Sequence, residues 1–231
     1  MENKRVIPAS ELIINEDGSI FHLHLKPEQL ADIVILVGDP GRVALVASFF
    51  DSKECEVSSR EFNTVTGTYK GKRMTVLSTG IGTDNIDICV TELDALANID
   101  FATRQVKDEF RQLTLLRLGT SGALQPDIKV GEQVFSRTSV GFDGLLNYYA
   151  GRNEVCDLGF EQAFMEHTGW NPLLTKPYFV DADKQLFELF KDVTREGVTI
   201  AAPGFYAPQG RWVRLQPQDL HLNEKIESFE Y

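Results

Sequence analysis

The 231-residue sequence has few cysteines and no long apolar run. Its three cysteines, Cys55, Cys89 and Cys156, are odd in number and widely spaced, so they indicate neither a disulfide framework nor a cysteine-based metal site. The apolar runs, such as residues 33–37, are the length of a strand and too short to span a bilayer. The first residues lack the apolar region of a signal peptide. We therefore expect a reduced, cytoplasmic protein.

Basic side chains are also in short supply. The sequence has 23 lysines and arginines against 34 acidic residues, which gives a formal net charge of −11. Such a surface repels nucleic acids and anionic lipids, so we expect neither as a partner. A small anion can still bind, because salt screens distant charges and leaves nearby arginines dominant. The four histidines form no convincing ligand pattern, so we predict no zinc site: they are His22, His24, His167 and His221.

The composition is that of a globular protein, with 42% hydrophobic and 25% charged residues. The length suffices for one large domain with a substantial core. The sequence contains no internal repeat and no linker rich in proline or serine. We therefore predict a single domain over residues 1–231.

Hydrophobic strands alternate with glycine loops and helices. The predicted strands cover residues 32–37, 73–77 and 114–118, with two more at 133–136 and 198–201. The loops after the first three strands are residues 38–42, 78–82 and 119–122. The predicted helices cover residues 43–50, 85–97 and 186–195. This alternation predicts an α/β fold with helices on the faces of a sheet and ligands at the carboxyl ends of the strands.

Arginines accompany two of the glycine loops, as Arg42 and Arg117. A helix N-terminus stabilises an anion by roughly 0.3–1 kcal/mol, whereas a charge-assisted hydrogen bond contributes about 1.5–3 kcal/mol. The arginines therefore matter more than the helix dipoles, and they predict an oxyanion pocket, most simply for phosphate. The standard nucleotide motifs do not fit: there is no P-loop, and Asn85 stands where a dinucleotide fingerprint needs its third glycine.

Six short motifs, in their order and spacing, resemble the nucleoside phosphorylases, in particular those of the uridine phosphorylase type. The motifs are residues 21–23, 38–42, 59–62, 78–82, 117–125 and 205–211. The resemblance implies a three-layer α/β/α sandwich around a mixed central sheet. It also implies a homodimer or hexamer with shared active sites, in which inorganic phosphate is the co-substrate and no redox cofactor or catalytic metal takes part.

The resemblance also assigns roles to individual residues. The residues implied to bind phosphate are Gly38, Arg42, Arg60, Arg117 and Thr120, with Arg60 supplied by the neighbouring subunit. Those implied to contact ribose are Thr120 and His22, the latter reaching the 5′-hydroxyl across the same interface. The residues implied to act in catalysis are Arg42, Arg117 and Thr120. Those implied to bind the base are Ser121, Gly122, Phe205, Gln209 and Arg211. Relatives hold a monovalent cation, potassium, at the positions of Glu61, Ile81 and Asn85, although Asn85 replaces the expected serine.

The pair Gln209 and Arg211 is the sharpest indication of the base. Uracil presents two carbonyl acceptors and one N–H donor, which an amide and a guanidinium match together. We expect an extended segment here, because a spacing of two residues then puts both side chains on one side. A site built on such hydrogen bonds can reject a mismatched base by a factor on the order of 10⁴. The pair therefore favours uridine over a purine nucleoside.

The predicted reaction is reversible phosphorolysis of uridine to uracil and ribose 1-phosphate, a pentosyl (glycosyl) transfer of pyrimidine salvage. Two alternatives stay open. One is another enzyme of the same fold, a purine nucleoside phosphorylase or a nucleosidase, although a nucleosidase does not need Arg42, Arg60 and Arg117. The other is a non-catalytic nucleoside-binding protein, because the family's Glu-Met-Glu segment, which holds the ribose hydroxyls, is not found after Arg211. We do not assign Glu230 that role, and we expect a C-terminal segment of the domain to be lacking.

Overall fold

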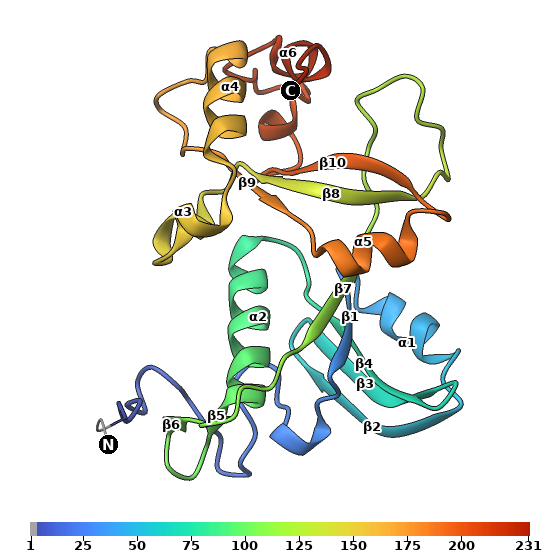
Figure 1. The fold of residues 1–231 in the computed structure, drawn as a ribbon, viewed down its shortest axis with the longest axis vertical. Helices are drawn as coiled ribbons and strands as arrows, with labels where there is room; N and C mark the ends of the chain where they lie inside the picture. The colour runs from blue at the N-terminus through green and yellow to red at the C-terminus, as the bar shows by residue number, and fades with distance from the viewer. Residues whose placement is uncertain (1–3) are drawn as a thin grey trace. The chain divides into compact units, whose positions relative to one another are not determined.

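The computed structural model describes residues 4–231 and contains two compact units (Figure 1). Unit 1 is Met1–Thr120 and unit 2 is Ser121–Tyr231. Each unit has its own sheet and its own hydrophobic core. The single domain predicted over residues 1–231 stays a prediction.

A five-stranded mixed sheet forms the centre of unit 1, in the order β2-β3-β4-β1-β7. Strand β1 pairs in parallel with β4 and β7, whereas β3 is antiparallel to β2 and β4. The predicted α/β class with a mixed sheet is therefore confirmed. The strands are β1 (Ile33–Val37), β2 (Ser52–Ser59), β3 (Phe62–Tyr69), β4 (Lys72–Ser78) and β7 (Thr114–Leu118).

Helices cover both faces of this sheet (Figure 1). Side chains alternate along β1, so that Val34 and Leu36 pack with Leu93 of α2, while Val37 packs with Val43 of α1. Unit 1 thus has the three layers that were predicted. Its remaining elements are α1 (Gly41–Ala47), α2 (Thr83–Asn98), the 3-10 turn η1 (Pro27–Gln29) and the short pair β5 (Ile99–Asp100) and β6 (Gln105–Val106).

Unit 2 is built on a three-stranded sheet in the order β10-β8-β9, with β8 parallel to β10 and antiparallel to β9. An aromatic core joins this sheet to α4, where Phe164 packs against Phe142 and Phe179. The elements are β8 (Val134–Gly141), β9 (Tyr178–Asp181), β10 (Arg195–Ala201), α3 (Arg152–Val155), α4 (Leu158–Thr168), α5 (Lys184–Phe190), α6 (Leu222–Glu227) and the 3-10 turns η2 (Leu145–Tyr148) and η3 (Ala207–Gln209).

One predicted boundary is wrong. The helix expected over residues 186–195 ends at Phe190, and Arg195 already begins β10. The backbone N–H of Arg195 donates to the carbonyl of Gln133, and Arg195 lies opposite Val134 in the β8 register. Pairing with β8 therefore gives these backbone groups the hydrogen bonds that they would otherwise have made within a longer helix. Among residues 4–231, no helix combines the length and apolarity that a membrane crossing requires.

Candidate functional site

The three glycine loops of unit 1 follow adjacent parallel strands. Because β4, β1 and β7 run in the same direction, their carboxyl ends meet at one edge of the sheet. The loops are tied together there, since the Thr79 N–H donates to the Val37 carbonyl at 2.8 Å. A Cβ on Gly38 would lie 3.7 Å from both the Arg117 Nη2 and the Gly80 carbonyl oxygen. The structure therefore brings together two predicted phosphate residues, Gly38 and Arg117.

Arg117 lies near the exposed end of β7, in register with Leu36 of β1. Its guanidinium folds back over Gly119, where a Cβ would lie 2.3 Å from Nη1. Glycine at position 119 therefore leaves the space that the guanidinium occupies. Thr120, the last residue of unit 1, follows in the same exposed loop.

Arg42 lies in the first turn of α1, directly after the loop at residues 38–41. The loop is shaped by Asp39, whose Oδ1 accepts a hydrogen bond from the Gly41 N–H at 2.9 Å. Among residues 4–231, no carboxylate forms an ion pair with Arg42, Arg60 or Arg117. In a chain with a net charge of −11, three arginines without acidic partners are available to an external anion.

Arg60 and His22 both lie next to the ring of Phe21. Arg60 occupies the turn between β2 and β3, with a positive φ of 54°. Its guanidinium carbon lies 5.8 Å from the centre of the Phe21 ring, and that ring packs edge-on against His22 at 4.7 Å. The two residues that the resemblance assigns to a neighbouring subunit's site are thus grouped on one part of unit 1.

Glu92 is a buried residue of this group that the sequence analysis missed. Its carboxylate accepts hydrogen bonds from the backbone N–H groups of His22 and Leu23 and lies 2.5 Å from the His22 Nδ1. A charged residue on the otherwise apolar inward face of the helix was the available signal, since the neighbours Cys89, Leu93 and Leu96 are all fully buried. Burial and the Glu92 charge together raise the pKa of the Cys89 thiol to about 12.

The predicted cation residues also lie together. Gly80 has a positive φ of 69°, and a Cβ there would lie 2.7 Å from both the Glu61 Cγ and the Asn85 Nδ2. The Asn85 amide donates to the Ile81 carbonyl at 3.1 Å, so this carbonyl faces Asn85. Potassium at this position stays a prediction.

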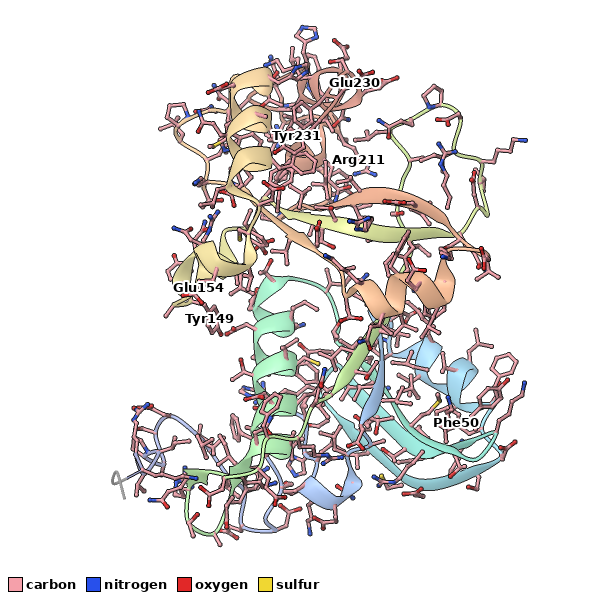
Figure 2. All side chains as sticks on the ribbon, viewed as in Figure 1. Phe50, Tyr149, Glu154, Arg211, Glu230 and Tyr231 are labelled. Carbon is pink, nitrogen blue, oxygen red and sulfur yellow. The ribbon has the colours of Figure 1, made fainter. Side chains whose placement is uncertain are left out.

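In unit 2, three of the predicted base-binding residues contact one another. The Arg211 guanidinium lies 4.0 Å above the centre of the Phe205 ring, and its Nη1 donates to the Gln209 Oε1 at 2.5 Å. The same Nη1 donates to the Phe205 carbonyl, and the Gln209 Nε2 donates to the Gly204 carbonyl at 3.1 Å. Phe205 is 60% exposed, so the cluster is open to solvent. Arg211 lies beyond β10 in unit 2 (Figure 2).

The prediction that Gln209 and Arg211 lie on an extended segment is wrong. Gln209 ends the 3-10 turn η3, and Gly210 takes the left-handed conformation with a φ of 70°. The Arg211 N–H then donates back to the Tyr206 carbonyl at 2.9 Å. The two side chains meet because the chain turns at Gly210, where a Cβ would lie 2.6 Å from the Asn223 Nδ2.

The other two predicted base residues lie in an exposed loop at the start of unit 2. Ser121 and Gly122 precede β8, and among the described residues, chain neighbours aside, no atom lies within 4 Å of the position that a Cβ on Gly122 would take. Glu230, which received no role, is an exposed residue near the labelled Tyr231 (Figure 2). Tyr231 itself stacks on Phe160, with ring centres 4.3 Å apart.

The family model described as "Phosphorylase superfamily" matches residues 32–228, and the chain belongs to this superfamily. The chain is 30% identical over 197 residues to the uridine phosphorylase of Haemophilus influenzae, which covers 84% of this chain and 66% of that protein. It is 34% identical over 134 residues to the uridine phosphorylase of Thermococcus kodakarensis, covering 58% of this chain and 43% of that protein. The chain thus spans less than two thirds of these relatives.

Purine enzymes are also among the relatives. The DeoD-type purine nucleoside phosphorylase of Geobacillus stearothermophilus is 36% identical over 119 residues, covering 51% of this chain and 45% of that protein. Among solved structures, a Trypanosoma brucei nucleoside phosphorylase that shows uridine phosphorylase activity matches with a TM-score of 0.82 and 29% identity. This match covers 94% of this chain and 78% of that one. The superfamily is therefore established, and its members similar to this chain include both uridine and purine nucleoside phosphorylases.

Proposed function

We propose that the protein catalyses the reversible phosphorolysis of uridine to uracil and ribose 1-phosphate. The observation that carries the proposal is the cluster of Phe205, Gln209 and Arg211 in unit 2. An aromatic ring and an amide, both in contact with one guanidinium, offer a stacking surface and the hydrogen-bonding groups that complement the uracil edge.

The cluster retains capacity for a ligand. Arg211 uses Nη1 in both of the hydrogen bonds described above, and a guanidinium carries five N–H donors in all. The Gln209 Oε1 accepts one hydrogen bond from Arg211 and has a second lone pair for the uracil N3–H. The remaining Arg211 donors can then serve a uracil carbonyl. Adenine, guanine and hypoxanthine have no matching pair of carbonyls around one N–H, which favours the pyrimidine.

The arginines of unit 1 provide for the second substrate, phosphate. Arg42, Arg60 and Arg117 have no acidic partner among the described residues, and Arg117 lies beside Gly38 at the carboxyl edge of the sheet. We infer that they hold phosphate as the nucleophile for C1′, together with Thr120. The leaving uracil becomes negatively charged, and Arg211 stabilises this anion more than it does neutral uridine. This difference lowers the barrier, and no covalent intermediate is needed.

The grouping of Arg60 with His22 around Phe21 supports a shared site in a homodimer or hexamer. In this proposal one subunit supplies both residues to its neighbour's phosphate and ribose. Potassium bound near Glu61, Ile81 and Asn85, a cytoplasmic location and a role in pyrimidine salvage belong to the same proposal.

A phosphate-dependence assay tests the reaction. The purified protein is incubated with uridine, with and without phosphate, and uracil and ribose 1-phosphate are quantified. We expect uracil only when phosphate is present. Equal release without phosphate would indicate a nucleosidase, faster turnover of inosine would indicate a purine enzyme, and saturable uridine binding without products would indicate a non-catalytic protein.

The variant Arg211→Ala tests base recognition. Loss of a hydrogen bond from a charged donor removes about 1.5–3 kcal/mol, so kcat/KM for uridine should fall roughly 10- to 150-fold. The KM for phosphate should change far less. Arg214→Ala is the matched control, because Arg214 is an exposed arginine of the same segment without a base-binding role. An equal loss for uridine and phosphate would count against the assignment of Arg211 to the base.

Mixed oligomers test the shared site. The variants Arg42→Ala and Arg60→Ala are each expected to lose most activity. Subunits of the two variants, denatured and refolded together, should recover part of it, since an intact Arg60 then faces an intact Arg42 across some interfaces. Failure to recover activity in demonstrated mixed oligomers would show that Arg60 serves its own subunit.

A further inference from the structure

The segment that presents His22 is fixed by burial on both sides of the histidine. Ile20, Leu23 and Leu25 are fully buried in the core of unit 1. The Ile20 N–H donates to the Leu25 carbonyl at 2.8 Å, and the His24 N–H donates to the Ile20 carbonyl at 3.0 Å. The backbone therefore makes a closed turn that leaves little freedom to the residues between its anchors.

Glu92 fixes the histidine ring on this turn. The carboxylate reaches from α2, 70 residues further along the chain, and lies 2.5 Å from the His22 Nδ1. It accepts the backbone N–H of His22 at 3.1 Å and that of Leu23 at 2.9 Å. One carboxylate thus holds both the backbone and the imidazole of the same residue, and the edge-on contact with Phe21 limits ring rotation further.

This arrangement determines which ring nitrogen carries the proton. An ionised carboxylate can only accept, so the hydrogen of the contact with Glu92 must lie on Nδ1. On a neutral imidazole the other nitrogen, Nε2, then carries a lone pair and accepts. Among the described residues nothing is hydrogen-bonded to the His22 Nε2, so its lone pair is available to a ligand.

We propose that Glu92 is a positioning residue that holds His22 in the form protonated on Nδ1, so that Nε2 accepts a hydrogen bond from a hydroxyl on the nucleoside sugar. The consequence for the substrate rests on the proposed function: sugars that carry a 5′-hydroxyl are selected over those in which that hydroxyl is replaced by hydrogen. Glu92 itself does not touch the substrate; it acts through the imidazole that it orients.

The first test reads the imidazole directly and needs no activity. Side-chain ¹⁵N spectra of the intact protein are recorded about two pH units above the ordinary histidine value of ~6.5, and His22→Gln assigns the signal. We expect the form protonated on Nδ1 in the wild type. Glu92→Met, which keeps the side-chain length and replaces the carboxylate by a weakly accepting thioether, should shift His22 to a mixture of both forms. A wild-type ring protonated on Nε2 would overturn the proposal.

The second test compares the phosphorolysis of uridine with that of 5′-deoxyuridine. One neutral hydrogen bond corresponds to a preference of roughly 3- to 10-fold in kcat/KM. The preference should decrease from Glu92 through Glu92→Gln, which retains one acceptor, to Glu92→Met, and His22→Ala should abolish it. The double variant should lose no more than His22→Ala, because both residues act through one contact.

The control is Asp94→Asn, which removes a carboxylate from an exposed position of the same helix, where Asp94 accepts from Asn98. The preference of this variant for uridine over 5′-deoxyuridine should equal that of the wild type. A purely structural role of Glu92 would slow both nucleosides equally and leave the preference unchanged, which would refute the substrate claim. If the wild type phosphorolyses no nucleoside, the proposed function has failed, and the ¹⁵N spectra alone decide whether Glu92 positions His22.

Discussion

Each unit buries a glutamate on its longest helix, and the two carboxylates have different kinds of partner. Glu92 of α2 accepts from two backbone N–H groups and an imidazole, and brings no cation into the core. Glu161 of α4 is fully buried and instead pairs with two cations. The Arg152 Nη2 lies 2.7 Å from its Oε1, and the Lys176 Nζ lies 2.9 Å from its Oε2.

The pKa values of the cysteines beside these glutamates reflect the different partners. Burial raises the pKa of Cys89, and the Glu92 charge adds to this effect. Burial also raises the pKa of Cys156, where the positive charge of Arg152 opposes the rise while the charge of Glu161 and a hydrogen bond to it add to the rise. The negative field of a carboxylate is undiminished beside neutral donors, whereas paired cations oppose it. Both carboxylates thus act on a neighbouring thiol, and only beside Glu161 does a cation oppose the effect.

The largest effect should follow from breaking the ion pair of unit 2. Glu161→Gln leaves Arg152, whose side chain is only 10% exposed, without its counter-charge, so the free energy of unfolding should fall by about 3–5 kcal/mol. Urea unfolding measures this change. Lys176→Gln is the control: Lys176 is half-exposed, so its loss should amount to only about 0–1 kcal/mol. Equal losses in both variants would show that Arg152 is not the critical partner.

A smaller effect is expected from Glu92→Gln in unit 1. The amide retains one acceptor oxygen and strands no buried cation, so we expect a loss of about 1–3 kcal/mol in the free energy of unfolding. The same urea unfolding experiment gives the value. If Glu92→Gln proved more destabilising than Glu161→Gln, the distinction drawn between the two carboxylates would be wrong.

The third effect is absent at neutral pH and should appear only in alkali. Because the folded pKa of Cys89 is about 12 against an ordinary value of 9.0, its contribution to stability is complete below pH 9 and is lost as the pH rises toward 12. The loss is about 1.4 kcal/mol per pH unit in that window. Burial and the hydrogen bond to Asp143 also raise the pKa of Tyr178 and add to the decline in unit 2.

The variant Cys89→Ala separates these contributions. Its free energy of unfolding should be lower than that of the wild type at neutral pH, owing to the lost side chain, but should decline less steeply above pH 9. Denaturant unfolding at several alkaline pH values gives both slopes. Identical slopes would mean that Cys89 does not titrate in this window.

Local signals were sufficient for the framework of unit 1. The run at residues 33–37 is buried on both faces as β1, and the helix expected over residues 85–97 is present as α2. The strand–loop–helix order also predicted that Gly38 and Arg117 would lie at one edge of the sheet, because parallel neighbours end together. The strands β2 and β3 were missed, since their polar and threonine-rich runs carry little hydrophobic signal.

Long-range contacts explain what sequence reasoning did not find. Glu92 lies 70 positions from His22, and no local pattern connects a helix residue with a turn at that separation. The end of α5 depended on β8, because Arg195 pairs with a strand about 60 residues earlier. The turn at Gly210 that joins Gln209 to Arg211 is stabilised by neighbours such as Asn223, whose amide donates to the Gln209 carbonyl.

By itself, the sequence determined the α/β class, the three glycine loops and the identity of the arginines beside them, because strand periodicity and glycine breaks act over a few residues. Only the tertiary structure decided which side chains are neutralised and which remain available. Arg152 forms an ion pair with Glu161, while Arg42 and Arg117 have no carboxylate partner among the described residues. Charge pairing depends on distances between residues that are far apart in the sequence, and only the folded chain sets these distances.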